Sequence, residues 1–210
     1  LRQLGRFIGR LHAIGKEQSY QHRPTLDVTT FGSNCSRFLL EHDFIPYELI
    51  KAYESLAEDL IQRVAWCYER CPDLKLIRTH GDCHRGNILW TNEGPHMVDL
   101  DDSRMAPAIQ DLWMFLSGER EDCERTLHIL LEGYTLFTDF EPSELNLIEA
   151  LRTLRLMHYF AWIARRWSDP AFPRAFPWFN TSRSWEQHIL DLREQAALMD
   201  EPPLTWQAVN

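Results

Sequence analysis

The sequence predicts an α+β fold that is mostly helical and contains one small β-hairpin. Apolar residues recur at helical spacing in several long stretches, which is typical of amphipathic helices. One short segment, residues 88–100, instead places two β-prone runs around a group of turn residues. With 210 residues and 44% hydrophobic content, the chain can bury a substantial core. No linker or repeat interrupts it, so we expect one domain over residues 1–210.

The first expected element is a helix at the start of the chain, whose apolar residues share one face: Leu4, Phe7, Ile8, Leu11 and Ile14. Gly5 and Gly9 lie inside this helix, so we expect them to permit close packing rather than to bind phosphate. A long second helix is predicted from about Pro46 to the region of Cys67 and Cys71. A strand that begins at Lys75 then leads into residues 80–87.

Residues 88–90 and 96–100 are predicted to form the two strands of the hairpin, with turn residues between them at 91–94. Helices are expected at residues 107–117, 121–138, 143–167 and 182–199. Residues 169–179 contain three prolines among aromatic residues, which indicates a rigid loop whose rings cover the core. Arg165 and Arg166 are expected to be a solvated helix C-terminus rather than an anion site.

The most informative segment is HGDCHRGN at residues 80–87. The catalytic loop of protein kinases is written H-R-D-L-x-x-x-N, and His80, Asp82 and Asn87 fall at the same offsets, with Gly81 where the arginine would stand. Phosphoryl transfer needs a carboxylate that orients the attacking hydroxyl and takes its proton, together with hard oxygen ligands for Mg²⁺. Asp82 suits the first task. Asn87 and Asp99, at opposite ends of the hairpin sequence, suit the second.

A zinc site is the competing interpretation, because Cys67, Cys71, His80 and His84 have the spacing C-x3-C-x8-H-x3-H. The gap between the two pairs is too short for a zinc finger. Both cysteines also lie on or near the long predicted helix, where free cysteines are usually buried. We therefore expect core thiols.

The pattern His-Gly-Asp-x-His-x-Gly-Asn, followed by x-Asp-x-Asp at residues 98–101, resembles the aminoglycoside phosphotransferase and choline kinase superfamily. Residues 5–12 look like the first helix of that family's C-terminal lobe. Residues 110–113 look like the segment whose aspartate, here Asp111, supports the catalytic loop together with His80. Residues 22–24 and several segments between 161 and 178 resemble a group of bacterial stress-response kinases within the superfamily.

The resemblance implies the C-terminal lobe of a protein-kinase-like fold and a cytoplasmic Ser/Thr protein kinase that uses ATP and Mg²⁺. It makes Asp82 the catalytic base, and it makes Asn87 and Asp99 the residues that hold Mg²⁺ and the nucleotide. His84 takes the place of a lysine that contacts the γ-phosphate in ordinary protein kinases, with a purely structural loop histidine as the alternative. The roles of two further acidic residues stay open: Asp101 and Asp102.

Three functions remain after the resemblance is taken into account. A Ser/Thr protein kinase is favoured, and a small-molecule kinase for an amino alcohol, aminoglycoside or homoserine-like substrate is the alternative, because Asp101 stands where protein kinases have the glycine of Asp-Phe-Gly. A non-catalytic regulatory module is disfavoured by the presence of Asp82, Asn87 and Asp99.

None of the three lysines lies in a V-A-I-K-like context and no Gly-rich loop is present. We therefore expect a nucleotide-clamping lobe before residue 1.

Composition excludes several kinds of partner. A formal net charge of −9 opposes binding to nucleic acid, which depends on lysine and arginine at the phosphates. No stretch of about 18 apolar residues is present to span a membrane. Five cysteines without a signal-like N-terminus fit a reducing cytoplasm. We expect a monomer that meets protein substrates, neither nucleic acid nor membrane.

Overall fold

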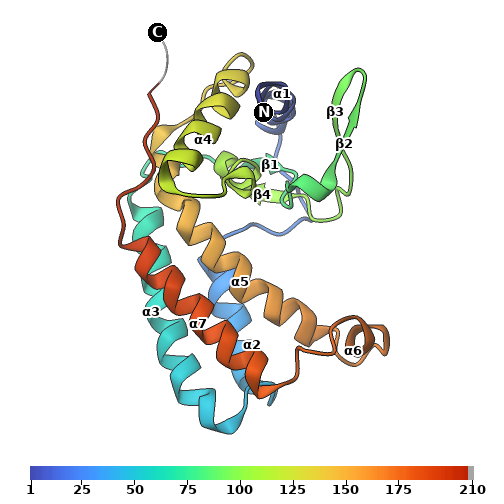
Figure 1. Cartoon of the computed structure of the whole chain (residues 1–210), viewed down its shortest axis with the longest axis vertical. Coiled ribbons are helices and arrows are strands. Elements are labelled where there is room, and N and C mark those ends of the chain that lie inside the picture. Colours follow the sequence, from blue (N-terminus) through green and yellow to red (C-terminus); the bar gives the residue numbers. More distant parts are fainter. Residues whose placement is uncertain (208–210) are drawn as a thin grey trace. The chain divides into compact units, whose positions relative to one another are not determined.

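The computed structural model describes residues 1–207, and it is mostly helical with small antiparallel sheets, as the sequence predicts (Figure 1). The chain divides into two compact units. Unit 1 comprises Leu1–Leu26, Arg70–Ile148 and the described part of Pro203–Asn210, and unit 2 comprises Asp27–Glu69 and Glu149–Pro202. The expectation of a single domain over residues 1–210 stays a prediction.

In unit 1, helix α1 (Arg2–Gly15) packs against helix α4 (Arg120–Tyr134). The two backbones approach so closely that a side chain on Gly5 would overlap the carbonyl of Leu130. A Cβ on Gly9 would lie 2.6 Å from the carbonyl oxygen of Tyr134. Both glycines therefore permit close helix packing, which confirms the sequence prediction. The helix predicted for residues 121–138 ends at Tyr134, where a turn begins.

Unit 1 also contains two antiparallel strand pairs. Strand β1 (Ile77–Thr79) pairs with β4 (Arg104–Ala106), and β2 (Ile88–Thr91) pairs with β3 (Gly94–Met97) as the predicted hairpin. The second hairpin strand begins and ends earlier than the predicted residues 96–100. Pairing starts at Gly94, whose φ is +121°, and the chain leaves the strand before Asp99, whose φ is +64°. Strand β4 has no counterpart among the elements predicted from the sequence.

Short 3-10 helices connect the remainder of unit 1: η3 (Arg85–Asn87), η4 (Ala108–Asp111), η5 (Trp113–Phe115) and η6 (Pro142–Leu147). The single helix predicted for residues 107–117 is therefore wrong. The buried side chains of Gln110 and Asp111 bond to the backbone of residues 80 and 81, and the chain turns at Leu112 between the two short helices.

Unit 2 consists of helical segments. A π-helix, η1 (Val28–Ser33), leads into α2 (Asn34–Glu41), and η2 (Tyr47–Leu49) leads into α3 (Ile50–Glu69). Helix α5 (Ile148–Arg165) enters this unit after its first residue, and α7 (Ser182–Met199) packs against α3. Helix α7 has the predicted bounds. The loop predicted for residues 169–179 contains a short helix, α6 (Ala171–Ala175), and the carboxylate of Asp169 accepts a hydrogen bond from the N–H of its first residue.

The core of unit 2 is aromatic. The ring of His188 stacks on Phe160 with 3.6 Å between centroids, and Tyr53 and Trp185 pack beside it. Within residues 1–207, neither ring nitrogen of His188 has a hydrogen-bond partner. Burial lowers the pKa of His188 to about 3, so the ring is neutral at physiological pH.

All five cysteines are buried free thiols, including Cys67 and Cys71 as predicted. The thiol of Cys71 donates to the carbonyl oxygen of Ser143 at 2.9 Å. Over residues 1–207, no helix is both long enough and apolar enough to cross a membrane.

Candidate active site

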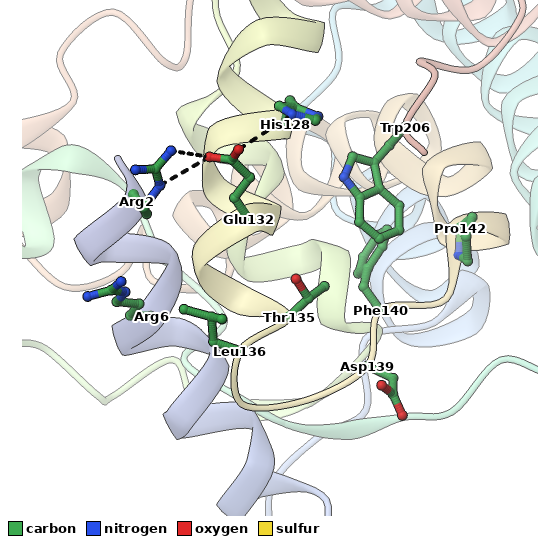
Figure 2. A pocket seen from close by; sticks show the side chains of 10 residues that line it. All are labelled: Arg2, Arg6, His128, Glu132, Thr135, Leu136, Asp139, Phe140, Pro142 and Trp206. Carbon is green, nitrogen blue, oxygen red and sulfur yellow. Dashed lines mark hydrogen bonds and ion pairs between the residues drawn. The ribbon is translucent and has the colours of Figure 1, made fainter. Parts of the chain in front are cut away.

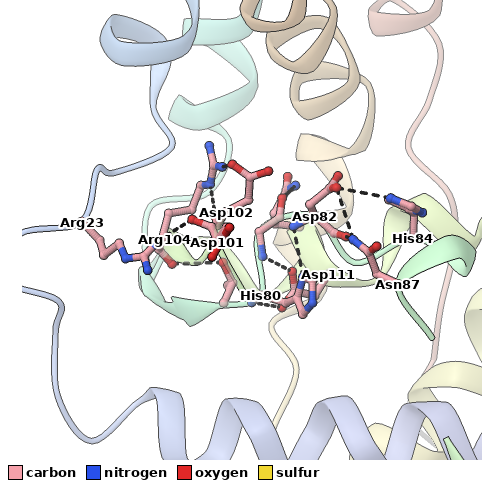
Figure 3. A network of polar contacts seen from close by, with 12 residues as sticks. Arg23, His80, Asp82, His84, Asn87, Asp101, Asp102, Arg104 and Asp111 are labelled. Atoms are coloured by element: carbon pink, nitrogen blue, oxygen red, sulfur yellow. Dashed lines mark hydrogen bonds and ion pairs between the residues drawn. The ribbon is translucent and has the colours of Figure 1, made fainter. Parts of the chain in front are cut away.

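Residues 80–87 form a loop between strand β1 and strand β2, and most of the predicted site residues lie on it (Figure 3). Gly81 has a φ of +85°, a conformation that residues with a side chain rarely adopt. A Cβ at this position would also collide with the carbonyl oxygen of Asp102. The loop therefore requires glycine at the position where protein kinases have arginine.

Asp111 holds the first residues of this loop. Its carboxylate accepts hydrogen bonds from the backbone N–H of His80 at 2.6 Å and of Gly81 at 2.9 Å. The side chain is completely buried. Bonds from two adjacent N–H groups to one charged acceptor fix the path of the backbone ahead of Asp82.

Three residues with no role predicted from the sequence complete this support: His12, Tyr134 and Gln110. A ring nitrogen of His12 lies 2.9 Å from the Asp111 carboxylate, and its other nitrogen lies 3.0 Å from the hydroxyl of Tyr134. Gln110 donates its side-chain amide to the carbonyl oxygen of Gly81 at 2.9 Å. In the sequence, the only indication of a role for His12 is its position at the end of residues 5–12, the segment that resembles the family's first helix.

Asp82 is partly buried and lies beside two polar side chains of the same loop. Asn87 donates Nδ2 to the carbonyl oxygen of Asp82 at 3.0 Å and approaches the carboxylate at 3.4 Å. His84 accepts a hydrogen bond at Nδ1 from the N–H of Gly86, so its Nε2 carries the proton and faces the Asp82 carboxylate at 3.3 Å. The loop thus orients the Asp82 carboxylate, and the oxygen Oδ1 of Asn87 takes no part in these bonds.

Asp99 is positioned through its neighbour Val98. The N–H of Val98 donates to the carbonyl oxygen of Asn87 at 3.0 Å, and the carbonyl of Val98 lies 2.9 Å from Nε2 of His80. Both backbone groups of Val98 are therefore bound to the loop of residues 80–87. Asp99 follows in the left-handed region with φ of +64° and an exposed side chain. Strained conformations of this kind concentrate at functional sites.

The two acidic residues whose roles were left open differ in their surroundings. The carboxylate of Asp102 forms an ion pair of 2.5 Å with the buried Arg104, which also donates to the carbonyl of Asp102 at 2.6 Å. The carbonyl oxygen of Asp101 accepts a hydrogen bond from Arg23, and its side chain is exposed. Asp102 therefore stabilises the turn that follows Asp99.

Cys83 lies in the centre of the loop and is a candidate nucleophile by residue type alone. It is completely buried, and its thiol contacts the sulfur of Met97 at 3.9 Å. Burial, with smaller contributions from Asp111 and Asp82, raises the pKa of the Cys83 thiol far above its ordinary range. The protonated, buried thiol is therefore unsuited to nucleophilic catalysis.

The residues of the site suit Mg²⁺ better than zinc. Mg²⁺ is usually held by one or two protein oxygens together with phosphates and water, and Asn87 Oδ1 and the exposed Asp99 carboxylate supply such oxygens. A structural zinc site needs four protein ligands and a catalytic zinc site needs three. Over residues 1–207, no group of three or more His, Cys, Asp or Glu side chains could hold a metal ion.

Unit 1 contains a cavity of about 200 Å³ lined by Lys16, Lys75 and Glu144, and two larger ones. One, of about 350 Å³, is lined by His80 and Leu100 of the site region and by Arg23, Arg78 and Tyr20. The other, of about 700 Å³, lies between α1 and α4, where Arg2 and His128 face Glu132 and Trp206 covers Phe140 (Figure 2). None of the predicted site residues lines the larger cavity, so it takes no part in the site described above.

Comparison with known proteins confirms the resemblance noted from the sequence. Residues 1–148 match the family described as "Phosphotransferase enzyme family". The chain is 41% identical over 201 residues to "Stress response kinase A" of Escherichia coli strain K12. It is 39% identical over 201 residues to "Serine/threonine protein kinase RdoA" of Salmonella typhimurium strain LT2. Each alignment covers 96% of this chain but 60% of the relative, so the chain spans about three fifths of the length of these curated proteins.

Solved structures share the fold at low sequence identity. The amicoumacin kinase hAmiN, in complex with AMP-PNP, Ca²⁺ and Ami, aligns with a TM-score of 0.62 at 18% identity, covering 97% of this chain and 59% of that one. A microcompartment-associated aminopropanol kinase aligns with a TM-score of 0.59 at 15% identity, covering 95% and 60%. The kinase-like fold expected from the sequence is thereby confirmed.

Proposed function

This chain belongs to the phosphotransferase enzyme family, and from that premise we propose that the protein transfers the γ-phosphoryl group of ATP to a serine or threonine hydroxyl of a protein. The observation that carries the proposal is the cluster of Asp82, His84 and Asn87 on one loop. The hydrogen bond from Val98 to the carbonyl oxygen of Asn87 ties the residue before Asp99 to the same loop. The names of the curated relatives support a protein acceptor.

Each side chain has a role that its contacts support. The Asp82 carboxylate would accept a hydrogen bond from the attacking hydroxyl and then take its proton. The Nε2–H of His84, 3.3 Å from Asp82, would hold that carboxylate in place or turn to a phosphate oxygen. Asn87 Oδ1 and the Asp99 carboxylate would hold Mg²⁺, which neutralises the phosphate charge that develops during transfer.

A small-molecule acceptor is the second candidate. The acidic Asp101 stands where protein kinases have the glycine of Asp-Phe-Gly, a departure shared with small-molecule kinases. The aligned hAmiN and aminopropanol kinases are small-molecule kinases by name, but at this level of identity they support the fold and not the acceptor.

The test is a labelling experiment on the full-length protein. Radiolabelled γ-phosphate ATP and Mg²⁺ would be incubated with a heat-treated bacterial protein extract and, separately, with a metabolite panel. Label on protein, absent when Asp82→Asn replaces the wild type, would support the proposal. Label confined to a metabolite would establish the second candidate. Equal labelling by the wild type and Asp82→Asn would overturn the assigned site.

A further inference from the structure

Unit 2 contains a stretch whose charge is opposite to that of the chain as a whole. Residues 150–184 carry six arginines and one acidic residue, Asp169, whereas the chain has a net charge of −9. The same stretch is rich in aromatic residues. A basic and aromatic segment on an acidic protein is not needed for solubility, which indicates a role in recognition.

Four of these residues form one stripe, three of them on α5 and the fourth, Arg166, directly after its last residue. Arg155, Tyr159, Trp162 and Arg166 are separated by four, three and four positions, which places them on the same helix face. The Arg166 guanidinium lies over the Trp162 ring, 4.6 Å from its centroid. Burial raises the pKa of Tyr159, and the charge of Arg155 partly offsets the effect, so these two side chains are neighbours. We call these four residues the arginine–aromatic stripe.

Tyr159 of the stripe and the neighbouring Trp178 are held in place but remain exposed, whereas Trp162 is half-buried. Tyr159 and Trp162 stack with 6.2 Å between centroids, and Tyr159 also stacks on Trp178 at 6.5 Å. Phe172 and Phe176 pack against Trp162 at 5.2 and 6.0 Å. Nevertheless Tyr159 is 39% and Trp178 is 42% exposed. Rigid, exposed aromatic rings flanked by arginine are the side chains that dominate protein–protein contacts, because they lose little conformational entropy on binding.

We propose that the arginine–aromatic stripe and Trp178 dock an acidic, aromatic-containing segment of a protein substrate. The inference rests on the proposed protein kinase function, and it adds a recognition surface to the catalytic loop. The stripe is about 16 Å long at 1.5 Å per residue, which matches about five residues of an extended peptide. Arg155 and Arg166 at its two ends would pair with carboxylates, while the rings between them stack on aromatic side chains.

Binding can be measured without catalysis. The full-length protein, without nucleotide, would be titrated into a fluorescein-labelled peptide of alternating glutamate and tyrosine, and anisotropy recorded. Arg166→Glu should weaken binding by at least about tenfold, and Trp178→Ala should weaken it to a similar degree. Arg183→Glu, which reverses the charge of another exposed arginine of unit 2, is the matched control and should bind as the wild type does. Circular dichroism would show that each variant is folded.

The outcomes separate this inference from the proposed function. Asp82→Asn should bind the peptide normally, so loss of phosphoryl transfer would leave the docking result intact. Equal binding by Arg166→Glu and the wild type, or no binding by either, would overturn the docking surface alone. Tighter binding of an oligothymidylate than of the peptide would also overturn it, because the surface would then recognise nucleic acid. A peptide in which glutamine replaces glutamate should bind more weakly, because the arginines would lose their partners.

Discussion

The carboxylate of Asp111 and the ring of His12 lie 2.9 Å apart, and both side chains are completely buried. His12 belongs to α1, so this helix contacts the same carboxylate that accepts hydrogen bonds from the backbone N–H groups of His80 and Gly81. The loop of residues 80–87 is therefore positioned by a buried polar network, whose disruption should cost both stability and activity.

Replacing Asp111 with Asn should lower the free energy of unfolding by about 3 kcal/mol or more, because it breaks a buried charged contact and leaves two N–H groups poorly paired. Urea unfolding of the full-length protein measures this. Asp73→Asn, at an exposed position, is the control. A loss below about 1 kcal/mol, the range of surface substitutions, would contradict the supporting role of Asp111.

Replacing Asp82 with Asn should reduce kcat by roughly 10² to 10⁴-fold, the usual effect of removing a positioned general base. Binding of Mg·ATP should change little, since the base does not hold the nucleotide. Glu93→Gln on the hairpin turn provides a control for the loss of a nearby negative charge. A variant with near wild-type turnover would show that another group takes the proton.

Asn87→Ala and Asp99→Asn should each weaken Mg²⁺-dependent nucleotide binding, with Asp99→Asn the more damaging because a formal charge is lost from a hard cation site. Asn tolerates the left-handed conformation of residue 99, so this substitution separates charge from backbone strain. Calorimetric titration of Mg·ATP into both single variants and the double variant tests the shared site. Strictly additive losses would indicate two independent roles.

Glu144 should make the protein less stable as the pH rises from about 4.5 to 7. Burial raises the pKa of its carboxyl to about 7, although the hydrogen bond from the N–H of Ile109 at 2.9 Å opposes the shift. The folded state thus favours the protonated form of Glu144. The free energy of unfolding should fall by about 1.4 kcal/mol per pH unit as the pH rises across this window. Glu144→Gln should remove this slope, whereas the exposed Glu121→Gln should keep it. Identical pH profiles of Glu144→Gln and the wild type, from urea unfolding, would refute the effect.

His188 should make the protein less stable as the pH falls, the opposite of the effect of Glu144. Its pKa of about 3 in the folded protein lies below the ordinary value of about 6.5, so only the unfolded chain takes up a proton between these limits. Stability should therefore fall by about 1.4 kcal/mol per pH unit as the pH drops from 6.5 towards 3. His188→Phe keeps an aromatic ring against Phe160 and should flatten this dependence. His42→Phe, at an exposed histidine of the same unit, should not.

The sequence predicted those parts of the fold and site that depend on nearby residues. Helix α7 and the hairpin follow from local periodicity and turn residues, and the candidate site lies within residues 80–99. Strand β4 was missed, because only three residues pair with a strand 25 or more positions away. The 3-10 helices at residues 108–115 and the role of His12 depend on contacts between distant segments, which leave no local pattern. The roles of the site residues stay predictions.

A side chain at position 81 would collide with Asp102, and this contact limits how loops can be exchanged between enzymes. The arginine of the protein-kinase tripeptide cannot be introduced here alone, since the turn after Asp99 occupies the space it would need. An exchange with an ordinary protein kinase would therefore have to include residues 80–102 together, so that the loop and the turn that faces it change as one piece.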